Sequence, residues 1–103
     1  MGNDRILSLI GLATKAGKVA SGEFSTEKAI KGHKACMVVV ASDASDNTKK
    51  MFENMCAWHK VPMIVYGTKE SLGRAMGKEH RASLALLDMG FYKSIEKLVN
   101  PAD

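Results

Sequence analysis

Residues 37–41 read Met37-Val38-Val39-Val40-Ala41, a run that is apolar without alternation and rich in β-branched residues. Such a run is typical of a strand that is buried on both faces, in a sheet that helices cover on each side. Ser-Asp-Ala-Ser at 42–45 follows at once and supplies N-cap candidates for a helix over about 46–59. The next strand is expected over 61–66, with Pro62 at its beginning, where no ladder hydrogen bond is lost.

The rest of the chain continues this alternation of helices and strands. Asn3 or Asp4 can cap a first helix that runs to about Ala16. The other expected elements are a short extended piece over 19–21, helices over 23–31 and 69–76, a strand over 83–87, and a last helix that carries Phe91, Ile95, Leu98 and Val99. This order predicts an α/β fold, a three-layer α/β/α sandwich around a small, mixed, mostly parallel sheet of about four strands.

Length and composition limit the class of protein. With 103 residues, 46% hydrophobic and 25% charged, the chain is expected to form a single domain over 1–103 with one core. Its longest apolar run, residues 36–41, is far shorter than the roughly 20 residues of a membrane-spanning helix. The N-terminus has no signal pattern, so we expect a cytoplasmic protein without a membrane partner. The net charge of +4 favours an anionic partner only modestly.

The sequence offers no pattern typical of catalysis or metal binding. Gly17 and Gly22 have the spacing of a phosphate-binding loop, but Glu23 stands where that loop needs a lysine. The three histidines are not joined to either cysteine by metal-ligand spacing. We therefore expect no catalytic residue, no metal and no cofactor. The large side chains of the helix over 46–59 are expected to face the core; they are Met51, Phe52, Met55 and Trp58.

Two cationic segments remain as candidates for a binding surface. At Gly22 a nucleic-acid backbone can approach the amide groups of the following helix, whose dipole favours an anion. Glu23 works against a phosphate there, but Lys28 and Lys31 can share one face of the helix. The second segment contains Arg74, Lys78, His80 and Arg81. Because binding loops of alternating α/β chains collect at one end of the sheet, the two segments can form one surface; ordinary solvated charges are the alternative.

The order of these pieces resembles that of a known protein family. The residues that carry the resemblance are Gly22 to Ala35, Met37 to Ala44, Val61 to Val65, Leu72 to Gly77 and Ala82 to Leu86. Together they are similar to the archaeal and eukaryotic large-subunit ribosomal protein family that binds kink-turn RNA, and in particular to its short bacterial members, called YlxQ. The resemblance covers roughly residues 4–99. It implies an α/β/α sandwich that recognises sharply bent RNA internal loops closed by sheared G·A pairs and catalyses no reaction.

The chain departs from this family at two positions of the RNA-reading motif Gly-x-Asn-Glu-x-x-Lys. Gly22 and Lys28 fall on the glycine and the lysine, but Phe24 and Ser25 occupy the asparagine and glutamate positions. Phenylalanine cannot hydrogen-bond a guanine edge, and the loss of such a hydrogen bond costs about 1–3 kcal/mol on the scale of direct base readout. Phe24 could instead stack on an unpaired base, or it could pack inward and staple the start of the helix.

The resemblance also implies a second RNA-facing loop, which reads Lys78-Glu79-His80-Arg81. Charge replaces the apolar contacts that are usual in the family, so phosphate attraction should carry more of the binding energy and salt should weaken it. The RNA-binding residues implied in this way are Gly22, Glu23, Phe24, Ser25, Lys28, Lys31, Lys78, Glu79, His80 and Arg81.

Two functions remain open on this reading of the sequence. The first is a ribosome-associated, non-catalytic protein of the translation apparatus that binds structured RNA, in particular ribosomal RNA, with an altered preference for the simple kink-turn. The second is a protein-interaction module of the translation machinery that has lost kink-turn binding. Its partners would be ribosomal or translation-factor proteins, and Phe24 would be its exposed apolar anchor.

Overall fold

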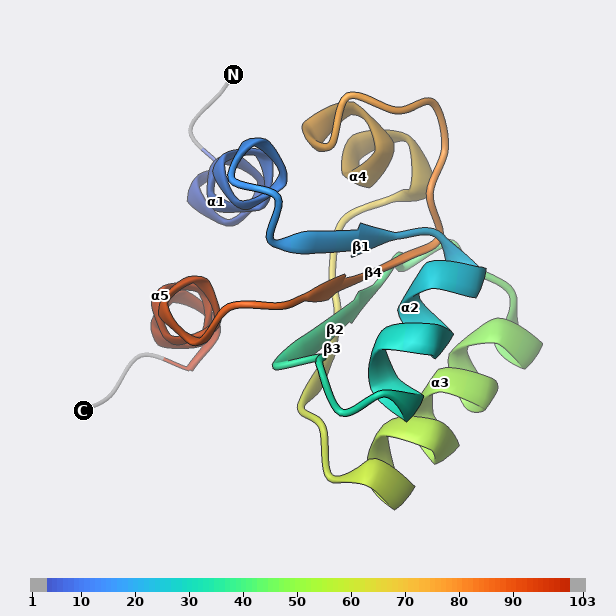
Figure 1. Ribbon diagram of the computed structural model, residues 1–103. Coiled ribbons are helices and arrows are strands. Elements are labelled where there is room, and N and C mark those ends of the chain that lie inside the picture. Colours follow the sequence, from blue (N-terminus) through green and yellow to red (C-terminus); the bar gives the residue numbers. More distant parts are fainter. Residues whose placement is uncertain (1–3, 101–103) are drawn as a thin grey trace.

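The computed structural model describes residues 4–100, and in this part of the chain one four-stranded sheet lies between two layers of helices (Figure 1). In chain order the elements are α1 (Arg5–Lys15), β1 (Val19–Ser21), α2 (Glu23–Lys31), β2 (Met37–Val40), α3 (Asp46–His59), β3 (Met63–Val65), α4 (Lys69–Ala75), β4 (Ser83–Leu86) and α5 (Met89–Val99). Helices α2 and α3 cover one face of the sheet, while α1 lies on the other with α4 and α5 packed against it. The predicted three-layer α/β/α architecture is confirmed.

The sheet is mixed, and its strand order is β1-β4-β2-β3. Strand β2 pairs in parallel with β3, with Val39 opposite Ile64, whereas β4 runs antiparallel to both of its neighbours, β1 and β2. The mixed four-stranded sheet agrees with the prediction, but the expectation that it is mostly parallel is wrong. The reason lies in α4, which has only 7 residues and keeps the chain at the end of the sheet where β3 stops. Strand β4 therefore starts at that end, with Ser83 opposite Val40, and runs back.

The core surrounds the two central strands. Every residue of β2 and β4 is buried, so the prediction of a strand covered on both faces is confirmed for Met37–Val40. Ile30 of α2 and Phe52 of α3 are fully buried on one face, and Ile10 of α1 and Ile95 of α5 are fully buried on the other. Burial of such a side chain contributes about 1.5–3 kcal/mol, so both helical layers are held to the sheet by apolar contacts.

Helix α3 corrects one expectation about the core. Phe52 and Cys56 are buried and lie four residues apart, and Met51 and Met55 are partly buried beside them. Trp58, however, is 82% exposed, so its expected place in the core is wrong. It follows Cys56 by two residues, which is more than half a helical turn, and therefore points away from the sheet.

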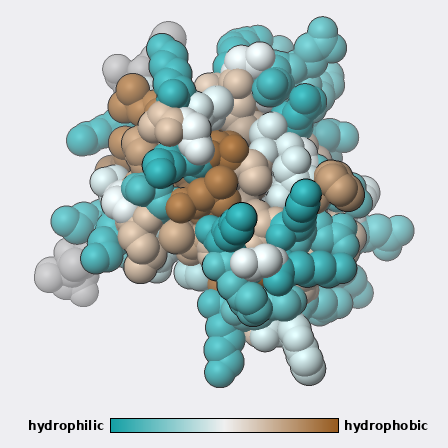
Figure 2. Space-filling view, in the orientation of Figure 1, coloured by the Kyte–Doolittle hydropathy of each residue, from teal (hydrophilic) through white to brown (hydrophobic). Residues whose placement is uncertain are grey.

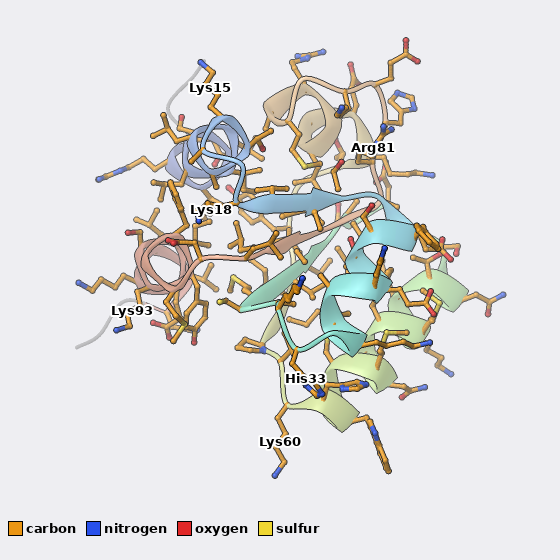
Figure 3. The ribbon with its side chains drawn as sticks, viewed as in Figure 1. Lys15, Lys18, His33, Lys60, Arg81 and Lys93 are labelled. Atoms are coloured by element: carbon orange, nitrogen blue, oxygen red, sulfur yellow. The ribbon has the colours of Figure 1, made fainter. Side chains whose placement is uncertain are left out.

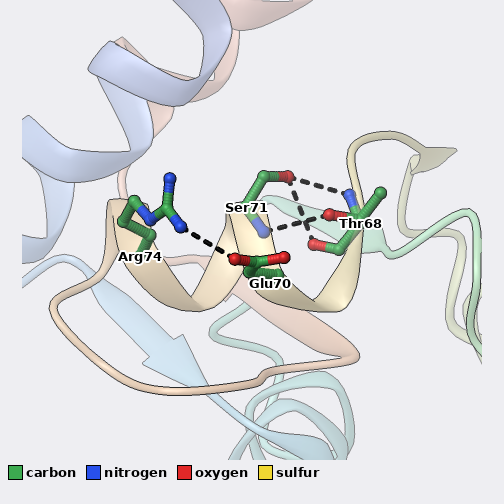
Figure 4. Close-up of polar contacts among 4 residues, drawn as sticks. All are labelled: Thr68, Glu70, Ser71 and Arg74. Carbon is green, nitrogen blue, oxygen red and sulfur yellow. Dashed lines mark hydrogen bonds and ion pairs between the residues drawn. The ribbon is translucent and has the colours of Figure 1, made fainter.

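The short helix α4 is held by side chains at its own beginning. Thr68 Oγ1 accepts a hydrogen bond from the Ser71 N–H at 3.0 Å, and Ser71 Oγ accepts one from the Thr68 N–H at 2.9 Å (Figure 4). Arg74 forms an exposed ion pair with Glu70 at 2.8 Å, one turn further along. This reciprocal capping satisfies amide groups that a helix start leaves open, and so stabilises a helix that would be too short to persist alone.

The loop between α4 and β4 crosses directly over Gly73. A Cβ atom at Gly73 would lie 1.9 Å from the carbonyl oxygen of Glu79, so no larger residue fits there. The loop is also tied to α4 by two backbone hydrogen bonds, from the Lys78 N–H to the Gly73 carbonyl at 2.7 Å and from the Arg81 N–H to the Lys69 carbonyl at 3.0 Å. The position of residues 78–81 is thus fixed by α4.

We expect Gly73→Ala to lower the free energy of unfolding by about 1–3 kcal/mol or more, because the clash is with backbone that cannot rotate away. It should also abolish the hydrogen-exchange protection of the Lys78 and Arg81 amides. Gly17→Ala is the matched control, since Gly17 has φ 73° but, apart from its two chain neighbours, no described residue has an atom within 4 Å of the added methyl group. That control should cost only backbone strain, about 1–2 kcal/mol, and leave the protection of the loop intact. Unchanged exchange in Gly73→Ala would contradict this account of the loop.

A side-chain hydrogen bond joins the beginning of α1 to the end of β3. Tyr66 Oη donates to Asp4 Oδ2 at 2.6 Å, while Asp4 Oδ1 accepts from the Leu7 N–H at 2.9 Å and caps α1. The other cap candidate, Asn3, lies outside the described residues. The hydrogen bond to Asp4 raises the pKa of Tyr66 to about 12, with burial and the charge of Asp4 as smaller causes. The protonated phenol is therefore the form that holds α1 to the sheet.

The raised pKa gives this contact a defined pH dependence. An unfolded tyrosine ionises near pH 10, so the stabilisation by Tyr66 is present in full below about pH 10 and is lost as the pH rises through about 12. Tyr66→Phe should cost about 1 kcal/mol at pH 8, measured by urea unfolding. Above pH 10 the wild type loses this stabilisation, so its free energy of unfolding should approach that of Tyr66→Phe. The other ionisable groups are common to both proteins and cancel in the comparison. A difference that stays constant up to pH 11 would show that the phenol proton is not involved.

Candidate functional site

Gly22 is the residue at which β1 passes into α2. Its backbone has φ 93° and ψ 165°, a region that only glycine occupies readily. The Gly22 N–H donates to the Ser83 carbonyl at 2.9 Å, and the Gly22 carbonyl accepts from the Thr26 N–H at 2.9 Å. The beginning of α2 is therefore hydrogen-bonded to the beginning of β4, the strand that the loop over residues 76–82 enters.

A buried pair of hydroxyl groups reinforces this junction. Ser83 Oγ donates to Thr26 Oγ1 at 3.2 Å, and both residues are fully buried. Because the Ser83 hydroxyl donates and the Thr26 hydroxyl accepts, neither buried oxygen is left without a hydrogen-bond partner, and the bond fixes the first turn of α2 on β4. These two positioning residues were not predicted. The sequence does carry a signal for them: each is a polar residue at a position where the pattern of its helix or strand places a buried side chain.

Arg81 lies over Gly22. A Cβ atom at Gly22 would be 3.7 Å from Arg81 Cδ and 3.8 Å from Arg81 Nε, and apart from the two chain neighbours no other residue in the range 4–100 comes within 4 Å of that point. One guanidinium nitrogen of Arg81, Nη1, donates to the His80 carbonyl at 2.8 Å. Figure 3 shows Arg81 above the first turn of α2, where the chain enters β4. The two cationic segments of the sequence thus meet at one end of the sheet, at Gly22 and Arg81.

The exposed face of α2 carries a mixed stripe of charged and aromatic side chains. Phe24, Glu27, Lys28 and Lys31 follow one another at i, i+3, i+4 and i+7, the spacing of one helix face. Phe24 is 77% exposed, which excludes the alternative that it packs inward and staples the helix start. Lys31 Nζ pairs with Glu27 Oε2 at 2.9 Å. Lys28 has no ion-pair partner within residues 4–100, so its charge is available to a ligand.

Lys28 stands between two shallow hollows. On one side, Phe24, Glu27 and Lys31 line the first hollow together with Lys28. On the other side, Ser25, Lys28 and Lys34 border a second hollow between α2 and the residues Ala20 and Leu87. Lys34 was not among the predicted site residues; the signal for it is a third cation, three residues beyond the end of a helix that already carries Lys28 and Lys31.

The remaining predicted residues lie at the rim of this surface. Glu23 is exposed in the first turn of α2, where its charge complements the helix dipole. Lys78, Glu79 and His80 expose their side chains along the loop that α4 holds in place. Of the four loop residues, Arg81 is the one whose side chain lies within 4 Å of a Cβ atom placed at Gly22.

The two thiols, and the histidines His33 and His59, are not among the predicted residues of this surface. Burial raises the pKa of Cys56 to about 11, and burial and then the charge of Asp88 raise the pKa of Cys36, so both thiols stay protonated at neutral pH. His33 and His59 are neighbours in space, with ring centroids 5.6 Å apart at the far ends of α2 and α3. Within residues 4–100, no group of three or more His, Cys, Asp or Glu side chains is placed to hold a metal ion. Nor does any helix in that range have the length and apolar character needed to cross a bilayer.

A mixed sheet between two helical layers, with a glycine-opened helix and a basic loop at one end, defines an α/β/α protein with a preformed polar surface. Residues 4–96 match the family described as ribosomal protein L7Ae/L30e/S12e/Gadd45, and the chain belongs to this family. The similarity that the sequence motifs indicated is thereby confirmed.

Relatives with known names are similar along most of the chain. RNA-binding protein YlxQ of Bacillus subtilis (strain 168) is 39% identical over 92 residues, which cover 89% of this chain and 92% of the relative. Large ribosomal subunit protein eL8 of Picrophilus torridus is 30% identical over 102 residues, which cover 94% of this chain and 80% of the relative. The chain is thus a YlxQ-like member of the family.

Solved structures agree with this fold. A protein with unknown function from Bacillus halodurans C superposes with a TM-score of 0.89 at 34% identity, covering 93% of this chain and 97% of that one. The Giardia lamblia 15.5kD RNA binding protein superposes with a TM-score of 0.78 at 20% identity, over 96% of this chain and 88% of that one, a likeness of fold alone.

We expect Gly22→Ala to lower the free energy of unfolding by about 1–3 kcal/mol, because alanine is strained at φ 93°. The loss should be the same in an Arg81→Ala background, since 3.7 Å is an ordinary van der Waals distance that Arg81 tolerates. A double-mutant cycle measured by urea unfolding checks this. If the cost vanished in the absence of Arg81, the contact between the two residues, and not the backbone, would be the reason for glycine.

Proposed function

We propose that this protein binds structured, kink-turn-like RNA, in association with the ribosome in the cytoplasm, and that it catalyses no reaction. The membership in the family and the RNA-binding and ribosomal names of the relatives support this class of partner. The observation that carries the proposal is the position of Arg81 beside Gly22, 3.7 Å from where a Cβ atom of residue 22 would lie, which brings the basic loop to the start of α2.

The geometry suits a bent phosphate backbone. The first turn of α2 has no side-chain cap at Gly22, so its amide groups face outward, and the absence of a side chain there lets a backbone approach. Arg81 stands on one side of this turn, and Lys28 lies one and a half turns further along α2. Both cations can bind phosphates, while the hydrogen bonds of Gly22 and Ser83 keep the two segments in register.

The proposed interface consists of the residues predicted from the sequence, which are Gly22, Glu23, Phe24, Ser25, Lys28, Lys31, Lys78, Glu79, His80 and Arg81. Glu23 has a structural part in it, because its charge stabilises the helix start. With Phe24 and Ser25 at the two base-reading positions, the hydrogen-bonded recognition of G·A pairs is weakened. We therefore propose an altered preference among bent RNA loops.

Binding should depend on the two cations that border the first turns of α2. In filter binding with a kink-turn hairpin, Lys28→Ala combined with Arg81→Ala should weaken binding about tenfold or more, on the scale of charged hydrogen bonds. The slope of log K against log salt should become shallower by about 0.7–0.9 for each phosphate that the double variant no longer neutralises.

Lys93→Ala combined with Lys15→Ala is the matched control. These two substitutions remove the same amount of charge as the test variant, but from α5 and α1, which lie on the other side of the sheet (Figure 3). A second RNA control is a hairpin of the same length without the internal loop. Weaker binding to this hairpin shows recognition of RNA shape, and equal binding shows general electrostatic attraction to RNA. Tight binding by the Lys28 and Arg81 double variant, with an unchanged salt slope, would overturn the proposed interface.

A second candidate function is a protein-interaction module, which the 77% exposure of Phe24 favours. Its partners would be ribosomal or translation-factor proteins. Affinity capture from lysate with and without nuclease separates the two functions. A partner that is retained after nuclease treatment and is lost with Phe24→Ala supports the module, and loss of all partners after nuclease supports RNA.

A further inference from the structure

Phe24 is a large apolar side chain left in solvent between charged neighbours. It lines the first hollow on α2 together with Glu27, Lys28, Lys31 and Gly32. This hollow has a volume of about 520 Å³, which lies within the range of roughly 300–1,000 Å³ found for small-molecule sites. Its size and openness to one side suit a single flat group better than a folded protein segment.

The walls of the hollow determine which part of a nucleotide fits. The Glu27 carboxylate forms an ion pair with Lys31 Nζ at 2.9 Å, so Lys28 is the one charged wall residue without an ion-pair partner among the described residues. The aromatic face of Phe24 offers stacking to any neutral base, whatever its sequence. Lys28 also lines the second hollow, which Ser25 and Lys34 border and Glu27 does not, so a phosphate bound there by Lys28 lies away from the Glu27 carboxylate.

We propose that an unpaired base of the bound RNA stacks on the ring of Phe24, and that Lys28 binds a phosphate next to that base. This inference rests on the proposed function, because it requires an RNA ligand at the α2 face. It specifies the ligand chemistry as an extruded or bulged nucleotide, read by its aromatic face and not by hydrogen bonds to its edge. Phe24 then supplies binding energy at a position where the family motif has a base-reading amide.

The surroundings of Phe24 favour a base over an apolar protein partner. Within residues 4–100, the other exposed large hydrophobic residues lie on other elements, and they are Leu12, Trp58, Val65, Met89 and Leu98. Figure 2 shows mostly hydrophilic side chains over α2 and α3, while the apolar patch of this view lies where α1, α5 and β1 meet. A protein anchor needs a contiguous apolar surface around it, whereas one stacked base needs only one ring.

The test uses the full chain, a kink-turn hairpin and purified ribosomal RNA as probes, with four variants. Phe24→Ala should weaken binding about 5- to 150-fold, which corresponds to ~1–3 kcal/mol of stacking at 1.4 kcal/mol per tenfold. Phe24→Trp should bind within about threefold of the wild type, while Phe24→Leu should resemble Phe24→Ala, because leucine keeps the apolar volume but cannot stack. Trp58→Ala is the matched control, since it removes an equally exposed aromatic ring from the far end of α3 and should leave the affinity unchanged.

A second measurement locates the base directly. 5-Iodouridine is placed in turn at each unpaired nucleotide of the hairpin, and photocrosslinks are mapped by mass spectrometry. One position should crosslink to Phe24, and this crosslink should disappear in Phe24→Leu. Because Phe24 is exposed, circular dichroism should show that all Phe24 variants keep the fold.

The possible outcomes separate this inference from the proposed function. If Phe24→Ala binds RNA as the wild type does while the Lys28 and Arg81 double variant does not, the stacked base is excluded and the RNA interface stands. If Phe24→Leu binds as tightly as the wild type, the contact is merely apolar and the inference is overturned. If the wild type binds neither probe, both proposals fall.

Discussion

The hydrogen bond from the Gly22 amide to the Ser83 carbonyl is the contact on which the candidate surface depends. It joins the beginning of α2 to the beginning of β4, two segments that are far apart in the chain, and the buried Thr26–Ser83 pair makes the junction rigid. Without this junction the basic loop and the α2 face would be separate pieces of surface. With it, the distance between the phosphate site near Arg81 and the nucleotide site near Phe24 is set before the ligand arrives. Binding would then cost little conformational entropy of the protein.

The sheet explains why this junction lies at one end of the molecule. Helix α4 is short, and the loop after it folds back over Gly73, so the chain never travels along the sheet between β3 and β4. Strand β4 therefore starts beside the ends of β1 and β2, and the segments that leave or enter these strands gather there. Recognition of RNA shape requires such a fixed arrangement, because a flexible surface could follow a bent backbone and a straight one equally well.

Local signals were sufficient for most of the fold, and tertiary contacts account for what was missed. The unbroken apolar run at Met37–Val40 indicated a doubly covered strand, and Gly22 and Gly32 enclosed α2 at its observed bounds. The direction of β4 could not be read, because a buried strand has the same composition in either direction. Trp58 was wrongly expected in the core, because the prediction relied on its apolar character and not on its angular position on α3. At the site, charge and spacing indicated Lys28 and Arg81. The approach of Arg81 to Gly22 and the pairing of Thr26 with Ser83 depend on the assembled sheet, and the outward direction of Phe24 could not be chosen from its neighbours in sequence.

The central place of β4 has a consequence for the order of folding during synthesis. Strand β1 reaches the rest of the sheet only through β4, although β1 is made first and β4 is the last strand to leave the ribosome. A nascent chain that ends before Ser83 can pair β2 with β3, but β1 and Gly22 at the start of α2 still lack β4, the strand to which they hydrogen-bond. Closure of the sheet thus waits for long-range pairing, which is slow compared with the formation of helices. The surface at Gly22 and Arg81 comes into being in this last step, so an incomplete polypeptide would not compete with the finished protein for its ligand.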